Sequence, residues 1–421
     1  MYDFTTIGNR LKRAMVTFSQ KVAKGFSKPT QKFIADMVYG IVASKSCKLT
    51  EIGRALKEDT SVKKIDERLG RHLIDFRERE ALMDGYLANI QTSIGKDTML
   101  LIDGSDITKP CSPKMEGIGS VYDASIEAFG EGYWTMGVVA LTAGNCHPLP
   151  VYEKLYPCKK QGGKGFNAEA EEALRYLRTH FDKSVPRIFD AGFDSWKVMQ
   201  GLASQEEKFI IRQCQNRSVI HDGKKTLVND VVSKVDCQQV MGFHSKTGKI
   251  STCKIGMTQI TLCRPSKLTL RLVVCKEFGE KPLVLYTNLD ESEESIATRV
   301  VKAYLMRWRI EEYHAFKKQG LNFEDLRVRS LNAIQNVDLL LTIAIGYLGT
   351  LCAIAADEVW VMEIIALSKR IEKTAVFLKK TKFFYYAVLD GVTSALEGLR
   401  CGISHYFAPH PPSLQIRFPG I

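Results

Sequence analysis

Apolar side chains recur at helical spacing in the first part of the chain. Between positions 49 and 73 they form two groups with steps of three or four residues, first Ile52 and Leu56, and then Val62, Ile65, Leu69 and Leu73. This period predicts amphipathic helices. The polar run at 59–61 interrupts the period and supplies residues that can cap a second helix. We therefore predict two short helices joined by a tight turn, within a helical region that covers residues 1–95.

From about residue 96 the pattern changes to apolar runs that are typical of strands. In chain order we predict strands at 98–103, 134–143 and 147–157, a helix at 167–181, a strand at 185–190, a helix at 194–205 and a strand at 208–213. Three strands followed by alternating helix and strand match the order of a ribonuclease H-like fold, although other α/β folds share it. The predicted fold class is mixed α/β.

Segments with β-type composition and glycine-containing turns then interrupt this order. They lie at 226–232, 246–263, 269–279 and 282–288. We predict an inserted β domain, followed by one long helix from Glu291 to Gln319 whose N-terminal end contains the capping sequence SEES. The apolar stretch Leu339–Ala356 lies between charged segments, so we predict a buried helix and no membrane span. The proline-rich tail is expected to be extended.

Five regions follow from these patterns. They are a helical DNA-binding region at 1–95, the first part of the core at 96–214, the inserted β domain at 215–289, the second part of the core with the long helix at 290–376, and a helical C-terminal region at 377–421.

The charge balance favours a polyanionic partner. The formal net charge is +12, with 45% hydrophobic and 25% charged residues, which is typical of a folded protein with excess cations. We predict that Lys63, Lys64, Arg68 and Arg71 face outward from the second short helix and bind duplex DNA as part of a helix-turn-helix. An ordinary helical hairpin with a solvated charged face explains the same pattern, and both interpretations stay open.

The cysteines indicate a reducing compartment. The chain has 11 cysteines and no C-x-x-C pair, which argues against a disulfide framework and against a zinc ribbon. The first residues lack the apolar core of a signal peptide. We therefore expect a cytoplasmic location.

Two aspartates stand at the ends of apolar runs. Asp103 follows Met99–Ile102, and Asp190 follows Arg187–Phe189. A carboxylate at the end of a buried strand has a fixed position at the edge of the sheet, where a metal ion can reach it. Asp106 and Asp194 are the nearest competitors, and either can instead cap a turn or a helix.

Four chemically distinct side chains share a spacing on the predicted long helix. On one straight helix, Tyr304, Arg307, Glu311 and Lys318 project within roughly 60° of one another. Such a face can give a carboxylate to a metal ion and cationic groups to phosphates. A solvated helix with an ion pair between Arg307 and Glu311 explains the same residues.

The spacing Y-x2-R-x3-E-x6-K over these four residues resembles the signature of the insertion sequence four family of DDE transposases. Neighbouring motifs are similar, and the resemblance covers roughly residues 99–331. These motifs are the apolar run before Asp103, Gly132-Tyr133-Trp134, Asp190-x3-Asp194, LYTN at 285–288 and RWRIE at 307–311.

The resemblance implies a ribonuclease H-like core with an inserted β domain. It implies that Asp103, Asp190 and Glu311 hold Mg²⁺, with Mn²⁺ as a substitute, and that the tyrosine, arginine and lysine of the signature hold a DNA end. The implied partners are double-stranded DNA, as transposon ends and target, and a second copy of the chain in a synaptic complex. The implied reaction is cut-and-paste transposition. A non-transposing nuclease of the same fold and an inactive DNA-binding protein are the alternatives.

Two positions depart from the family pattern. Ala191 follows Asp190, where relatives often carry arginine, and residues 215–289 contain no tryptophan. Some relatives place a tryptophan there to stack on a flipped base, so in this chain Phe243 or Tyr286 would have to do so. The sequence therefore supports DNA cleavage more strongly than it supports a reaction that passes through a DNA hairpin.

Overall fold

The computed structural model describes most of the chain in two compact units. Unit 1 comprises Met1–Lys96, Gly104–Ala170 and Glu311–Ile421, and unit 2 comprises Asp97–Asp103 and Glu171–Ile310. The boundaries fall within β1 (Thr98–Thr108), α6 (Phe166–His180) and α10 (Trp308–Ala315). The residues described are 4–95, 97–123, 127–142, 147–244, 250–263, 267–289, 296–355, 357–368 and 383–408.

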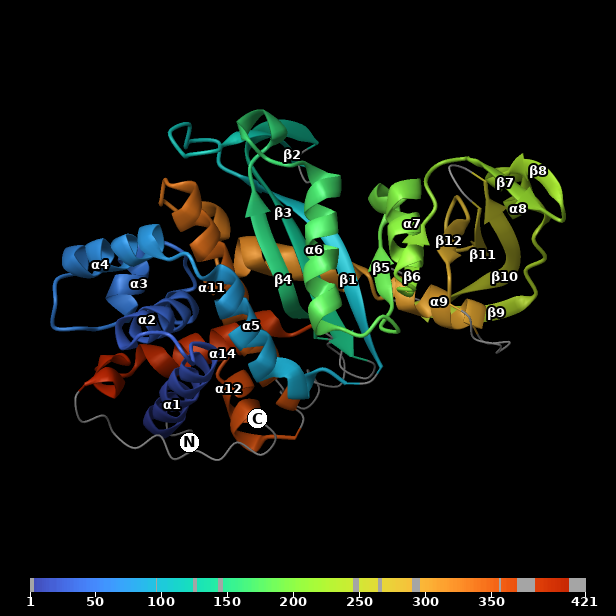
Figure 1. Ribbon diagram of the computed structural model, residues 1–421. Helices are drawn as coiled ribbons and strands as arrows, with labels where there is room; N and C mark the ends of the chain where they lie inside the picture. The colour runs from blue at the N-terminus through green and yellow to red at the C-terminus, as the bar shows by residue number, and fades with distance from the viewer. Residues whose placement is uncertain are drawn as a thin grey trace. The chain divides into compact units, whose positions relative to one another are not determined.

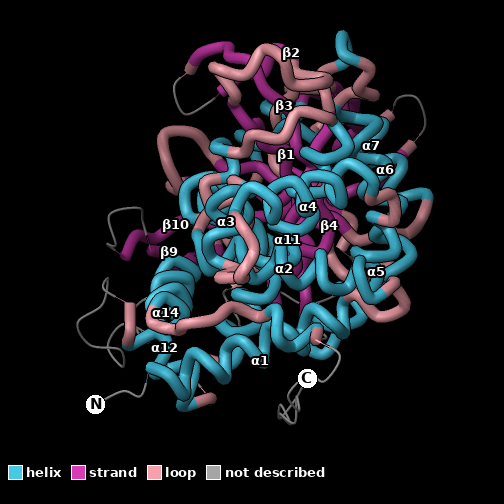
Figure 2. The backbone as a smooth tube through the Cα atoms, turned by 90° about the vertical axis from the view of Figure 1, so that its left-hand side faces the viewer, coloured by secondary structure: helices cyan, strands magenta, loops and turns pink. Residues whose placement is uncertain are grey.

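Unit 1 is largely helical, as predicted for both ends of the chain. Its helices are α1 (Phe4–Val22), α2 (Lys28–Ser44), α3 (Leu49–Ala55), α4 (Val62–Asp75), α5 (Arg79–Ile90), α11 (Leu331–Ile354), α12 (Val359–Ala366) and α14 (Tyr385–Glu397). Short 3₁₀ turns lie at Gln91–Ser93, Lys159–Gln161, Phe323–Asp325 and Ser404–Phe407. The N-terminal helices pack against the C-terminal ones, since α1 and α2 contact α14 while α2, α4 and α5 contact α11 (Figures 1 and 2).

Helix α11 is the central element of unit 1. It is long and apolar enough to cross a membrane, but 89% of its most apolar window is buried within the protein. It packs on β4 as well as on the neighbouring helices. The prediction of a buried helix at this place is confirmed.

The strands of unit 1 are β2 (Gly119–Asp123), β3 (Ala128–Thr142), β4 (Leu149–Tyr156) and the second half of β1. β3 pairs with β2 and with β4 in antiparallel register. In unit 2, the first half of β1 pairs in parallel with β5 (Arg187–Phe189), which pairs in parallel with β6 (Phe209–Arg212). The strand order β4-β3-β1 and then β1-β5-β6 is that of a ribonuclease H-like core, and the predicted mixed α/β fold is confirmed.

The rest of unit 2 contains the predicted β insertion. Its elements are the 3₁₀ turn Ala191–Phe193, α7 (Trp196–Ser204), β7 (Ser218–His221), β8 (Lys224–Leu227), α8 (Val228–Lys234), β9 (Gln239–His244), β10 (Ile250–Leu262), β11 (Leu268–Lys276), β12 (Leu283–Thr287) and α9 (Ile296–Leu305). The antiparallel order β6-β12-β11-β10-β7-β8 continues the sheet, and β9 also pairs with β10. Helix α9 packs against β10, β11 and β12.

The prediction of one long helix at 291–319 is wrong. The chain forms α9, a turn at Met306 and Arg307, α10 and then a π-helical turn at Phe316–Gly320. The bonds from Arg307 N to Tyr304 O (2.9 Å) and from Ile310 N to Arg307 O (3.0 Å) span three residues, so the backbone tightens around Arg307. The spacing of the signature therefore does not describe one straight helical face. The SEES sequence lies outside the described residues.

Two smaller predictions also change. Strand β8 ends at Leu227, and the following residues form α8, not a strand, because Val228, Val231 and Val232 are buried at helical spacing. Ser61 occupies the position before α4, but its side chain makes no capping hydrogen bond. Most of the proline-rich tail, residues 409–421, lies outside the described part of the chain.

Candidate active site

Asp103 and Asp190 occupy neighbouring positions on two adjacent parallel strands. Asp190 directly follows β5, as predicted, but Asp103 lies in the middle of β1, because this strand continues to Thr108. In the register of β1 and β5, Ile102 lies opposite Phe189, and each aspartate is the next residue. The sheet therefore brings the two predicted carboxylates together within unit 2. Asp190 Oδ1 accepts a hydrogen bond from Gly192 N (2.8 Å), which orients this carboxylate. Carboxylate oxygens are the donors that Mg²⁺ prefers, so this pair fits a divalent cation.

The predicted DNA-binding arginine contacts the first of these aspartates. Arg307 Nη1 donates to Asp103 Oδ2 at 2.9 Å, and the two side chains are only 14% and 17% exposed. The guanidinium also lies over the ring of Tyr304, 5.9 Å from its centroid. The turn between α9 and α10 thus directs Arg307 toward the middle of β1, where Asp103 lies.

The signature lysine binds a different aspartate of the same strand. Within unit 1, Lys318 Nζ donates to Asp106 Oδ2 at 3.0 Å. Lys318 belongs to the π-helical turn, and its side chain is 21% exposed. Both cations of the signature are therefore engaged with carboxylates of β1, at positions 103 and 106.

The third predicted carboxylate lies on α10. Glu311 is exposed and follows Arg307 by four residues. Within the described ranges, no three or more His, Cys, Asp or Glu side chains are grouped closely enough to hold a metal ion.

Asp194, the competitor of Asp190, has a structural task. Its Oδ2 accepts hydrogen bonds from the backbone N–H groups of Cys214 (2.7 Å) and Gln215 (2.8 Å), and its Oδ1 pairs with Arg217. The carboxylate is fully buried. These contacts join the segment after β5 to the segment after β6 and leave no oxygen directed to solvent.

A buried charge cluster that sequence reasoning missed lies beside the π-helical turn. Lys317 pairs with Glu153 (2.8 Å) and with Asp338, and the side chains are 1%, 0% and 2% exposed. Tyr313 Oη donates to the other oxygen of Glu153 at 3.0 Å. Burial raises the pKa of Glu153 to about 7, with Lys317 opposing the shift and Asp338 adding to it. The one signal in the sequence is Asp338, a single charge within an apolar helix.

The four basic residues predicted to bind DNA from the second short helix do not share the same surroundings. Lys63, Lys64 and Arg71 are exposed on α4. Arg68 instead pairs with two carboxylates of unit 1, those of Glu58 (2.8 Å) and Asp36 (3.0 Å). Three of the four side chains therefore remain available to a ligand.

The aromatic residues predicted to stack on a base occupy unsuitable places. Tyr286 is fully buried in β12, and Phe243 packs against Phe278 with ring centroids 4.8 Å apart. Trp308 is 47% exposed, three residues before Glu311, and was not singled out from the sequence. Its neighbour Arg309 is only 2% exposed, with its guanidinium over the Trp308 ring.

A family model described as "Transposase DDE domain" matches residues 95–346, more than half of the chain. The chain belongs to this family. Asp103, Asp190 and the whole signature of this DDE transposase fall inside the matched region. The chain is also similar to a solved structure, the cryo-EM structure of a piggyBac transposase synaptic complex with hairpin DNA. The identity is 11% and the TM-score 0.44, with 100% of this chain and 87% of that chain covered.

Proposed function

We propose that this transposase cleaves DNA at the ends of a mobile element and joins the freed 3′ ends to target DNA, as a member of the insertion sequence four group. The observation that carries the proposal is the placement of Asp103 and Asp190 directly after the paired residues Ile102 and Phe189 of adjacent parallel strands, inside the region matched by the family model. Glu311 is the third carboxylate, assigned from its position in the signature.

Asp103, Asp190 and Glu311 would hold the Mg²⁺ ions, with Mn²⁺ as a substitute. When bound, a pair of such ions supplies an activated water and stabilises the leaving oxygen of the phosphodiester. Arg307 neutralises Asp103 in the DNA-free protein, and in the proposed complex its guanidinium binds a backbone phosphate. Lys318 is proposed to exchange Asp106 for a phosphate in the same way, and Tyr304 supports Arg307.

Double-stranded DNA is the proposed partner, bound as a synaptic complex of two chains and two ends. The net charge of +12 supports a polyanionic ligand. Lys63, Lys64 and Arg71 are proposed as phosphate contacts on α4. Arg68 is kept as a weaker candidate, because binding DNA would require it to leave Glu58 and Asp36.

The carboxylates are tested by single substitutions. We expect Asp103→Ala, Asp190→Ala and Glu311→Ala each to abolish Mg²⁺-dependent cleavage of a duplex that carries the inverted repeat flanking the gene, because metal ligands are lost. DNA binding should persist, since the basic surface remains. Glu280→Ala, which removes an exposed carboxylate of the β insertion, is the matched control. Cleavage by the Asp103 variant at the wild-type rate would contradict the assignment.

Joining a pre-cut end to a target plasmid distinguishes a transposase from a nuclease of the same fold. We expect the wild-type chain to produce joined products with Mg²⁺. Cleavage without any joined product would favour the nuclease. The absence of both reactions would favour an inactive DNA-binding protein, although all three carboxylates are present in the chain.

A further inference from the structure

One segment of unit 1 contains no carboxylate at all. From Phe4 to Ala35 the sequence has seven lysine and arginine residues and no Asp or Glu, which is more than half of the net charge of +12. A second acid-free segment, 237–276, also has seven. Of its four described cations, however, Lys254 pairs with Glu277 and both Arg271 and Lys276 donate to backbone carbonyls, which leaves Lys267 as the one exposed cation without an ion pair among the described residues. The two segments therefore differ in the cations they leave available.

The basic residues of the first segment form a stripe along α1. Arg10, Arg13, Lys21 and Lys24 are separated by steps of three, eight and three residues, with Thr17 in the middle of the long step. Residues three or four apart lie on the same side of a helix. Lys24 lies in the turn after α1, and Lys28 opens α2. We call Arg13, Lys21, Lys24 and Lys28 the α1 stripe.

The members of the α1 stripe are exposed, and none has an ion pair among the described residues. The other three cations of the segment are engaged. Arg10 lies over the ring of Trp360, Lys12 is buried and donates to Cys401 O, and Lys32 pairs with Asp36 and Glu58. Four exposed cations therefore lie within sixteen residues, 13–28, that contain no carboxylate.

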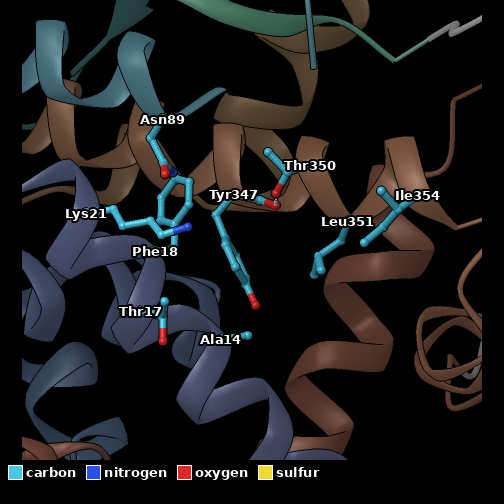
Figure 3. A pocket seen from close by; sticks show the side chains of 9 residues that line it. All are labelled: Ala14, Thr17, Phe18, Lys21, Asn89, Tyr347, Thr350, Leu351 and Ile354. Atoms are coloured by element: carbon cyan, nitrogen blue, oxygen red, sulfur yellow. Dashed lines mark hydrogen bonds between the residues drawn. The ribbon is translucent and has the colours of Figure 1, made fainter. Parts of the chain in front are cut away.

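A small cavity opens beside the stripe (Figure 3). Thr17 and Lys21 of α1 line it, together with Asn89 and with Tyr347 of α11. Among the described residues, Thr17 Oγ1 and Tyr347 Oη have no hydrogen-bond partner, and Tyr347 is only 3% exposed. The cavity holds about 20 Å³, which is room for one water molecule and not for a base. Lys21 therefore shares this cavity with two hydroxyl groups, but the cavity is too small to recognise a base.

We propose that the α1 stripe binds the phosphate backbone of duplex DNA, independently of base sequence and apart from the proposed catalytic carboxylates. The proposal rests on the proposed function, which supplies DNA as the partner. Unpaired, closely spaced cations match a duplex, whose phosphates carry one negative charge per about 1.7 Å of helix axis. The stripe lies outside residues 95–346, so it is not part of the matched catalytic domain.

The test is Lys21→Gln/Lys24→Gln/Lys28→Gln in the full-length chain. Binding to a random 30-base-pair duplex is measured across a salt series in EDTA. Each lost phosphate contact should reduce the slope of log affinity against log salt by about 0.9, so we expect a loss of two to three units. At 0.1 M salt the affinity should fall on the order of 100-fold. A duplex with the terminal repeat should lose the same factor.

The matched control is Arg54→Gln/Lys183→Gln/Lys254→Gln, which removes the same charge. Each of these side chains already pairs with an exposed carboxylate, Glu51, Glu206 or Glu277. We expect the control to retain its slope, and both variants to melt like the wild type. Equal losses in the two variants would overturn the proposal, because only net charge would then matter. An unchanged slope in the stripe variant would also overturn it, as would binding to phosphatidylserine vesicles in place of duplex DNA.

Failure of this proposal is distinguishable from failure of the proposed function. Binding in EDTA requires no catalysis, and Asp103→Ala should leave it intact. The stripe variant should cleave at the wild-type maximal rate once DNA is saturating, since its carboxylates are unchanged. A lost maximal rate at saturating DNA would contradict a role confined to binding.

Discussion

Arg307 and Arg309 are two residues apart, yet their surroundings differ completely. Arg307 contacts Asp103 in the middle of β1, whereas Arg309 is buried against Trp308. Replacing Arg309 would disturb packing as well as charge, so it is unsuitable as a control for charge. Lys302 is exposed on α9, so Lys302→Ala removes a charge from the same region without removing a buried side chain.

We expect Arg307→Ala to reduce the formation of paired-end complexes far more than Lys302→Ala does. A charge-assisted contact contributes about 1.5–3 kcal/mol, whereas a solvated charge contributes roughly 0–1 kcal/mol. The measurement is a gel-shift titration with DNA ends, alongside melting temperatures. Arg307→Lys should recover only part of the loss, because lysine cannot donate in bidentate geometry. If both variants formed equally little paired-end complex, only the loss of one positive charge would matter, and Arg307 would have no specific role.

The π-helical turn contributes one residue, Lys317, to a buried charge cluster. Lys317 enters the protein between Glu153 and Asp338, while the next residue, Lys318, reaches Asp106. One ammonium between two carboxylates leaves the cluster one proton short of neutrality. Burial favours the neutral form, which explains why the pKa of Glu153 is raised to about 7.

The cluster predicts a pH dependence of stability. A carboxyl with a higher pKa in the folded than in the unfolded state binds its proton more tightly when folded, so stability falls as pH rises from about 4.5 to about 7. Glu153→Gln imitates the protonated form and should flatten this slope, by at most about 1.4 kcal/mol per pH unit. Urea unfolding at several pH values measures it. Identical slopes in the variant and the wild type would exclude a proton at Glu153.

Lys317→Met tests the same cluster by removing its cation instead of a carboxylate. It leaves two buried carboxylates without a cation and should lower the free energy of unfolding by about 3–5 kcal/mol. If this variant were as stable as the wild type, the cluster would not contribute to stability.

At the scale of the whole chain, the two ends of the sequence share one core. Residues 333–352 of α11 are buried almost without interruption, and α2, α4, α5 and α14 contact this helix. A helix that is apolar on all sides must be surrounded by other elements. The N-terminal helices therefore rely on segments more than 200 residues away to cover their apolar faces.

We expect a fragment of residues 1–95 to lack a cooperative thermal transition by circular dichroism, because α2 would expose the side chains it buries in the full chain. Adding residues 331–408 as a second chain should restore a transition if the faces are complementary. A fragment that melts cooperatively alone, and binds DNA as tightly as the full chain, would instead identify the N-terminal helices as an independent domain.

The sequence by itself determined most of the elements and two of the chemical positions. Periodicity is a local property, so strands at 98–103, 185–190 and 208–213 were predicted close to their observed places. The same local pattern put Asp103 and Asp190 at strand ends, which is correct for Asp190 and wrong for Asp103, because β1 continues to Thr108. Local spacing also identified the signature residues, since a motif is defined by residue types and their separations in the sequence.

Only the tertiary structure decided which charged groups meet. Arg68 pairs with Asp36, 32 residues away, and Lys317 with Glu153, 164 residues away. Such partners are chosen by burial and by the order of strands, which no local window of the sequence contains. The interruption of the predicted long helix at Arg307 also involves a distant residue. The Arg307 side chain contacts Asp103, 204 residues away, and helical spacing alone does not predict the backbone turn at this position.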